Sequence, residues 1–111
     1  MTIGYDEFAA VEIRVGRVQR VEPFPEARRP AYRLWIDFGE PVGVRRTSAQ
    51  LTANYTLEEL RDRLVVAVTN FAPKQIGSFM SEVLVLGVPD ERGEVVLLAP
   101  DRDVGLGGRM Y

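Results

Sequence analysis

The chain has 111 residues, of which 14 are basic and 16 acidic, and it contains neither cysteine nor histidine. These missing side chains exclude disulfides, thiolate nucleophiles, cysteine-ligated zinc and histidine acid–base catalysis. The net charge of -2 excludes a broad basic surface of the kind that coats nucleic acid. No phosphate-binding glycine loop, nucleophile elbow or calcium loop occurs in the sequence. We therefore predict a binding protein without catalytic activity, cofactor or metal site.

The first residues carry Asp6 and Glu7 where a signal peptide would have a basic start followed by a long apolar stretch. No apolar run approaches the length of a membrane span. These features predict a cytoplasmic protein that does not insert into a membrane. Residues 1–55 carry eight basic and seven acidic side chains, and residues 56–111 carry six and nine. We expect any cationic site to come from the first half together with Lys74.

Two strands are predicted before residue 40. The first has apolar residues whose alternation changes phase at Gly16, which predicts a bulge there: Ile13, Val15, Val18 and Val21. The second runs from Tyr32 to Phe38 in strict alternation, with its polar face formed by Arg33, Trp35 and Asp37. A short hairpin partner at Val42 and Val44 is expected to end at the pair Arg45 and Arg46.

A helix and further strands follow. Thr56 to Glu59 forms a capping box, and leucines recur at helical spacing at positions 57, 60 and 64, which predicts a short helix. The continuous apolar run Leu64 to Val68 predicts a buried strand. Two more strands, Glu82 to Leu86 and Glu94 to Leu98, flank a turn at residues 89–93.

This order of elements predicts an all-β fold, a five-stranded OB-fold barrel with a short helix between strands three and four and short extra terminal segments. The alternative is a small β-sandwich, which accounts for the strands but not for the position of the helix. No internal repeat or linker divides the sequence, so we expect a single domain over residues 1–111.

The connection between the fourth and fifth strands is unlike a plain turn. A reversal of direction needs only two residues such as Asn-Gly. The stretch from Val68 to Gly87 instead has Asn70, Lys74, Gln75 and Phe79 in its middle, together with a proline and a glycine. This content predicts a loop that presents side chains to a ligand.

Several blocks of the sequence closely resemble the CsaA family. They are Phe24–Arg28 with Pro30–Ala31, Ile36–Gly39, Ser48–Gln50, Asn70–Phe71 with Pro73–Lys74, and Ser81–Gly87. The resemblance implies an OB fold and a homodimeric, cytoplasmic chaperone that binds unfolded precursor proteins for export. CsaA is also similar to the tRNA-binding domain found at the C-terminus of some methionyl-tRNA synthetases and in the endothelial monocyte-activating polypeptide. The alternative function that this likeness implies is a tRNA-binding module recognising RNA backbone shape.

The long connection differs from that of the tRNA-binding relatives. Asn70, Pro73, Lys74 and Ser81 match their pattern, but Gln75 stands where the relatives have a second basic residue. The substitution removes one charge from a loop expected to face phosphate, and phosphate contacts dominate affinity for nucleic acid.

The candidate peptide- or tRNA-binding residues are Asn70, Lys74, Gln75, Phe79, Arg45, Arg46, Arg28 and Arg29. We expect Phe79 to be exposed beside Met80, where it could contact peptide or stack on a base, and Phe71 to be buried. Asn70 could instead form a turn, and Lys74 and the paired arginines could be solvated charges. Arg45 and Arg46 should point to opposite sides of their strand, so that at most one joins a given binding face.

The dimer implied by the resemblance needs a contact surface. Natural candidates lie outside the barrel strands, at Tyr5 to Val11 and Val104 to Tyr111. Trp35 is a large apolar ring on an otherwise polar strand face, where Arg33 could stack on it.

Overall fold

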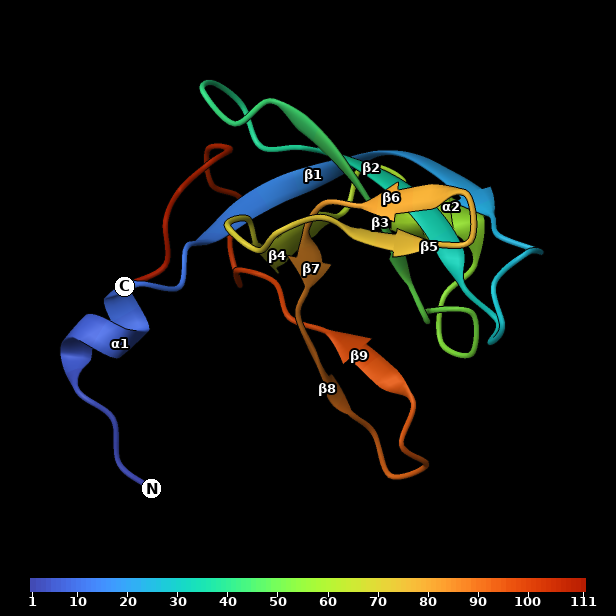
Figure 1. Cartoon of the computed structure of the whole chain (residues 1–111). Helices are drawn as coiled ribbons and strands as arrows, with labels where there is room; N and C mark the ends of the chain where they lie inside the picture. The colour runs from blue at the N-terminus through green and yellow to red at the C-terminus, as the bar shows by residue number, and fades with distance from the viewer.

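A computed structural model describes all 111 residues of the chain (Figure 1). The helices are α1 (Tyr5–Ala9) and α2 (Leu57–Leu60). The strands are β1 (Ile13–Pro23), β2 (Tyr32–Asp37), β3 (Val44–Ala49), β4 (Leu64–Val68), β5 (Lys74–Ile76), β6 (Phe79–Ser81), β7 (Leu84–Val85), β8 (Gly87–Pro89) and β9 (Val95–Leu97).

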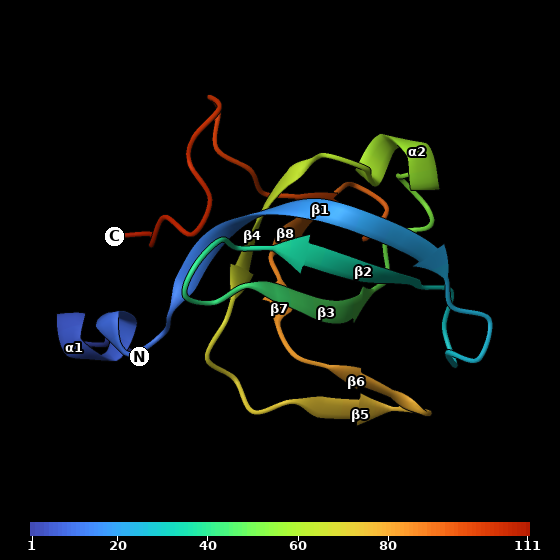
Figure 2. The same ribbon diagram turned by 90° about the horizontal axis from the view of Figure 1, so that it is seen from above.

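Five strands form one antiparallel sheet in the order β3-β2-β1-β4-β7, and the sheet curls into a nearly closed barrel. The long β1 pairs with β2 along one part and with β4 along another, so it bends around the barrel (Figure 2). The gap between β3 and β7 is bridged where the Thr47 hydroxyl donates to the carbonyl of Val83 at 2.6 Å. With α2 lying between the third and fourth barrel strands, this is the predicted OB fold.

The barrel core consists of the inward-facing residues of these strands and one leucine of α2. Its apolar members with at most 1% exposure are Val18, Leu34, Ile36, Phe38, Leu60, Val65 and Ala67. The predicted capping box holds the start of α2, because the amide of Glu59 donates to the Thr56 hydroxyl at 3.2 Å and the amide of Thr56 donates to Glu59 Oε1 at 2.9 Å. The cap fixes α2 so that Leu60 fills the core.

The bulge predicted at Gly16 lies elsewhere. The pairing of β1 with β2 changes register between Val18 and Arg20, while Gly16 pairs regularly with Val65 of β4. A Cβ added to Gly16 would lie 2.5 Å from Ile36 Cγ2, inside contact distance. The glycine is required because core side chains lie directly against the backbone, which is the second common meaning of a glycine within a strand.

The third strand, β3, begins at Val44, close to the position at which the sequence predicts its end, Arg45 and Arg46. Residues 39–43 form a turn in which the amide of Gly43 donates to the carbonyl of Gly39 and both glycines have positive φ. Val42 therefore lies in the turn, and β3 starts at Val44. As a result Arg45 and Arg46 lie early in β3 rather than at its end.

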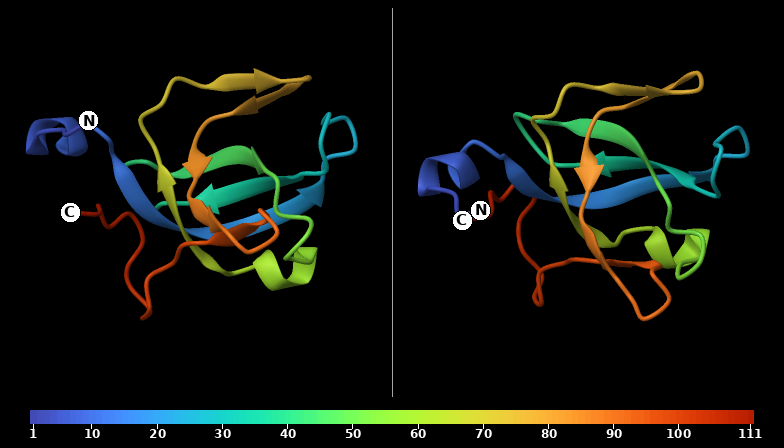
Figure 3. Two further views of the ribbon diagram at one scale, coloured as in Figure 1. Left: turned by 90° about the horizontal axis from the view of Figure 1, so that it is seen from below. Right: turned by 60° about the horizontal axis from the view of Figure 1, so that its bottom comes forward.

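The long connection after β4 folds into a hairpin of its own. Strands β5 and β6 pair through Lys74–Ser81, Gln75–Met80 and Ile76–Phe79. The hairpin forms a separate layer beside β3 (Figures 2 and 3). The strand predicted at Glu82–Leu86 is reduced to β7, and the chain continues into β8, which pairs with β9. None of the helices has the length and apolar character needed to cross a bilayer.

Candidate functional site

A groove of about 900 Å³ lies between the β5–β6 hairpin, the loop joining β1 to β2, the end of β3, and strands β7 and β9; we call it the hairpin groove. Nine of its seventeen lining residues are hydrophobic, so its floor can bury apolar groups. The floor is drawn from several elements and includes Ala31, Ala49, Leu51, Val85, Val95 and Leu97.

The rim of the hairpin groove is cationic. Arg28 and Arg29 approach from the β1–β2 loop and Lys74 from β5, and the only acidic lining residue is Glu26. All three cations are exposed, and none of them forms a salt bridge or a side-chain hydrogen bond within the chain. The rim can therefore pair with an anionic group of a ligand without breaking an internal ion pair. Gln75 also lines the groove, so four of the predicted site residues lie together.

Phe79 does not lie on the surface, and the prediction of its exposure is wrong. The side chain is 5% exposed and packs against Phe24 and Trp35, with ring centroids 5.5 and 6.0 Å away. The guanidinium of Arg46 lies over the same ring at 5.1 Å from its centroid. Pairing of Ile76 with Phe79 across the hairpin puts both side chains on the face toward the barrel. Phe79 thus anchors the hairpin.

The prediction that Phe71 is buried is also wrong. The side chain lies largely in solvent, with 54% of its surface exposed. The residue lies three positions after the end of β4, where the chain has left the barrel and the alternation of buried residues no longer applies. Neither phenylalanine of the connection therefore has the predicted environment.

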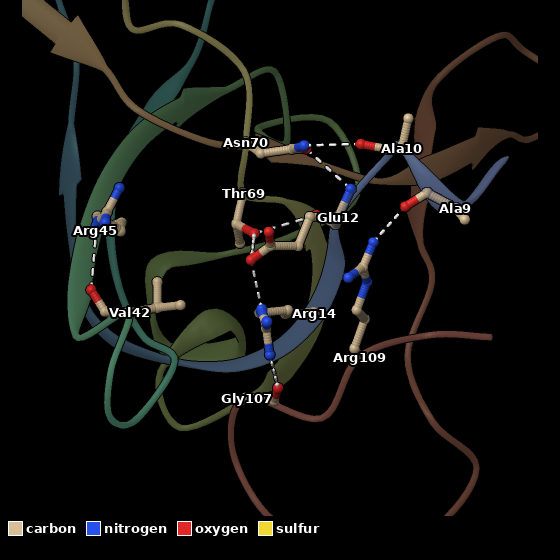
Figure 4. Close-up of polar contacts among 10 residues, drawn as sticks. All are labelled: Ala9, Ala10, Glu12, Arg14, Val42, Arg45, Thr69, Asn70, Gly107 and Arg109. Atoms are coloured by element: carbon tan, nitrogen blue, oxygen red, sulfur yellow. Dashed lines mark hydrogen bonds and ion pairs between the residues drawn. The ribbon is translucent and has the colours of Figure 1, made fainter. Parts of the chain in front are cut away.

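Asn70 lies outside the hairpin groove and joins the polar contacts drawn in Figure 4. Its Oδ1 accepts from the amide of Glu12 at 2.9 Å, and its Nδ2 donates to the carbonyl of Ala10 at 2.8 Å. The amide is therefore engaged in holding the segment that leads from α1 into β1. The role is to organise backbone, but the partners lie 58 and 60 residues away in the chain, so Asn70 does not form the local turn that the sequence left open.

The two arginines of β3 also lie outside the groove lining. Arg46 covers Phe79, and Arg45 donates through Nε to the carbonyl of Val42 at 3.2 Å. The expected pairing of Arg33 with Trp35 is wrong. Arg20 covers the indole at 4.4 Å, because the β1–β2 register puts Arg20 opposite Trp35.

Sequence reasoning missed the residues that attach the hairpin and close the groove. The amide of Glu82 donates to the carbonyl of Arg46 at 2.8 Å, and Glu82 Oε1 accepts from the amide of Arg46 at 2.9 Å. Ser48 and Gln50 line the groove, although they were left out of the candidate site. Their place in the block Ser48–Gln50 that resembles CsaA was the available signal.

A second hollow of about 800 Å³ is lined mainly by the C-terminal segment, together with Val15 of β1, Val66 of β4 and Leu86; we call it the terminal groove. Val104, Leu106 and Met110 lie along it and remain 42, 37 and 44% exposed. Both chain ends lie on this side of the molecule (Figures 1 and 3). The terminal groove thus includes much of the second segment suggested for a dimer contact.

Polar contacts join the two terminal segments beside the terminal groove (Figure 4). Arg14 donates to Glu12 Oε1 and to the carbonyl of Gly107, both at 2.7 Å, and Arg109 donates to the carbonyl of Ala9. The hydrogen bond from Arg14 lowers the pKa of Glu12 below its ordinary value, and the Thr69 hydroxyl contributes in the same direction. No group of three or more acidic residues lies close enough to share a metal ion.

Residues 13–109 match the family described as "Putative tRNA binding domain". The chain belongs to this family. The crystal structure of CsaA chaperone protein from Picrophilus torridus has 45% sequence identity and a TM-score of 0.93, with 99% of this chain and 100% of that chain covered. Chaperone CsaA from Bacillus anthracis str. Ames has 44% identity and a TM-score of 0.94, with full coverage of both chains. The resemblance to CsaA is thereby confirmed.

The tRNA-binding domain family also connects the chain to enzymes. The methionine–tRNA ligase of Pyrococcus abyssi is 36% identical over 110 residues, which are 99% of this chain. The same alignment covers only 15% of the ligase, so the chain spans about one seventh of the length of that curated relative. The likeness concerns one domain of the ligase.

Proposed function

We propose that this protein is a CsaA-like chaperone of the cytoplasm, which binds exposed segments of unfolded precursor proteins in the hairpin groove before their export. It acts by binding, without catalysis and without a cofactor. The 44 and 45% identities to CsaA chaperones over essentially the whole chain support this proposal.

The observation that carries the proposal is the combination of an apolar floor with a cationic rim in the hairpin groove. Hydrophobic burial is non-directional, so the floor can accept apolar side chains from unrelated sequences. The free charges of Arg28, Arg29 and Lys74 favour segments that also carry acidic groups. Such a surface binds many clients weakly, as a chaperone must.

We further propose a homodimer formed through the terminal groove. Its exposed apolar residues, Val104, Leu106 and Met110, form a patch that a second copy would remove from water. The hydrogen bonds from Arg14 and Arg109 hold both chain ends in place for this contact. A dimer has two hairpin grooves, so one long unfolded chain can engage both and gain avidity.

Binding of tRNA is the second candidate function. It is favoured by the match of residues 13–109 to a family described as tRNA binding and by three rim cations that have no internal partner. A tRNA backbone would engage Arg28, Arg29 and Lys74 through its phosphates, with no need for the apolar floor.

Titration separates the two functions. The probes are a permanently unfolded protein, reduced and alkylated at its cysteines, and bulk tRNA, each at low and high salt. Affinity for tRNA should fall steeply with salt through counterion release, whereas apolar polypeptide binding should hold or rise. Binding of tRNA at low salt, with no binding of the unfolded protein at either salt, would refute the chaperone proposal.

A further inference from the structure

The free edge of β5 is an unused pairing surface inside the hairpin groove. Strand β5 pairs only with β6, and beyond that ladder the backbone groups of Lys74, Gln75 and Ile76 make no hydrogen bond. The groove is lined by consecutive residues from Lys74 to Gly77 and by none of β6. Successive residues of a strand face opposite sides, so a groove that touches all of them meets the strand along its edge.

The edges of β3 and β9 at the groove already have partners. The edge of β3 is covered by Glu82, which bonds both backbone groups of Arg46, and by the Ser81 hydroxyl near the amide of Ser48. On β9, the amide of Leu97 donates to the Tyr55 hydroxyl, and Asn54 donates to the carbonyl of Val95. By contrast, neither side chains nor backbone cover the outer edge of β5.

The turn of the hairpin identifies the residue that faces outward. Gly77 has a φ of 60°, and Ser78 does not share a positive φ, as in a two-residue type II′ turn. In such a hairpin the closing pair, here Ile76 and Phe79, exchanges hydrogen bonds, and the next pair does not. The N–H and C=O of Gln75 therefore point away from β6, toward the open edge.

We propose that β5 binds its ligand by β-strand addition: an extended segment of an unfolded polypeptide lies in the hairpin groove and pairs with the backbone of Gln75. This inference rests on the proposed chaperone function and specifies its mode of binding. Backbone pairing is independent of ligand sequence, while alternate ligand side chains enter the apolar floor. The cations Arg28, Arg29 and Lys74 favour a segment whose outward side chains are acidic.

The test on the protein uses the substitution Gln75→Pro. Proline removes the outward N–H, and an edge strand tolerates it because that N–H has no partner in the ladder. Gln75→Ala is the matched control, since it removes the side chain and keeps the N–H. The probe is a capped synthetic peptide of alternating valine and glutamate. We expect Gln75→Pro to bind it about tenfold more weakly and Gln75→Ala to bind it nearly as wild type does. Equal affinity of a folded Gln75→Pro and wild type would overturn the inference.

A test on the ligand keeps the inference falsifiable if Gln75→Pro disturbs the hairpin. Peptides N-methylated at one position each are compared on the wild-type protein. Strand addition predicts affinity losses at alternate positions only, because alternate amides face β5. Equal affinity losses at every position, or no loss at any, would overturn strand addition while leaving the chaperone proposal intact. If neither the peptides nor the unfolded protein bind at all, the chaperone proposal itself is refuted. An equal loss of tRNA binding in Gln75→Pro would show that the proline disturbs the hairpin, and the N-methylated peptides then decide.

Discussion

The anchoring role of Phe79 makes a prediction with a calculable size. Phe79→Ala removes a ring that is 5% exposed and contacts two other aromatic rings. Truncation of a buried phenylalanine costs about 3–5 kcal/mol. Phe79 belongs to a small cluster with Phe24 and Ala31, separate from the ten-residue barrel core, and the adjacent Arg46 can relax into the space. We therefore expect the lower end, about 3 kcal/mol, which for a domain of this size lowers Tm by roughly 12 °C.

The assay is urea or thermal unfolding of Phe79→Ala beside Phe79→Leu, followed by peptide titration of both. Leucine keeps most of the apolar volume, so Phe79→Leu should retain most of the stability and of the peptide affinity. Loss of the anchor should also weaken peptide binding, because β5 is held over the groove through Phe79. An unchanged Tm of Phe79→Ala together with lost binding would refute this reasoning and make the ring a direct ligand contact.

Three further outcomes are expected. Lys74→Glu should leave most apolar peptide binding intact but cause a large, salt-sensitive loss of any tRNA binding. The control is Arg102→Glu, which reverses an exposed charge outside the groove. If Lys74→Glu changes neither peptide affinity nor tRNA affinity at low salt, Lys74 is not part of the site. Met110→Glu should convert the dimer into a species near the 12.5 kDa chain mass in sedimentation. Val88→Glu, a substitution of an exposed apolar residue outside the terminal groove, should leave the dimer intact. A monomeric wild type would contradict the proposed dimer. Because the folded pKa of Glu12 is lowered, its stabilising effect should be complete above about pH 4.3 and lost as pH falls through the folded value. Glu12→Gln should therefore reduce the free energy of unfolding at neutral pH and not at strongly acidic pH.

Most of the barrel could be predicted from the sequence because its signals are local. Alternation over Tyr32–Asp37, the apolar run of β4 and the capping box of α2 each reflect a pattern within a few residues. The bulge was predicted at the wrong residue because a glycine within a strand can mark either a bulge or a close approach of side chains to the backbone, and the two look alike in a sequence. Only the packing of Ile36 against its Cα shows which cause applies.

The candidate site was harder to predict because it depends on contacts between distant segments. Four of the predicted residues line one groove: Lys74, Gln75, Arg28 and Arg29. Asn70 instead forms a hydrogen bond with Glu12, which lies 58 residues earlier in the chain. The environment of Phe79 follows from the hairpin, whose signal was the short turn at Gly77 between two apolar residues. That signal was available, and the error came from interpreting the segment as an irregular loop.

The positions of the two grooves make the proposed dimer consistent with the proposed chaperone function. Figures 2 and 3 place the chain ends at one end of the molecule and the tips of the β1–β2 loop and the β5–β6 hairpin at the other. A dimer joined at the chain ends therefore leaves both hairpin grooves open. The longest dimension of one chain is 39 Å, so two chains end to end span at most roughly 80 Å, which about 24 extended residues can bridge. Long unfolded precursors can occupy both grooves at once, while short peptides and compact folded proteins cannot, so the avidity of the dimer itself favours unfolded clients.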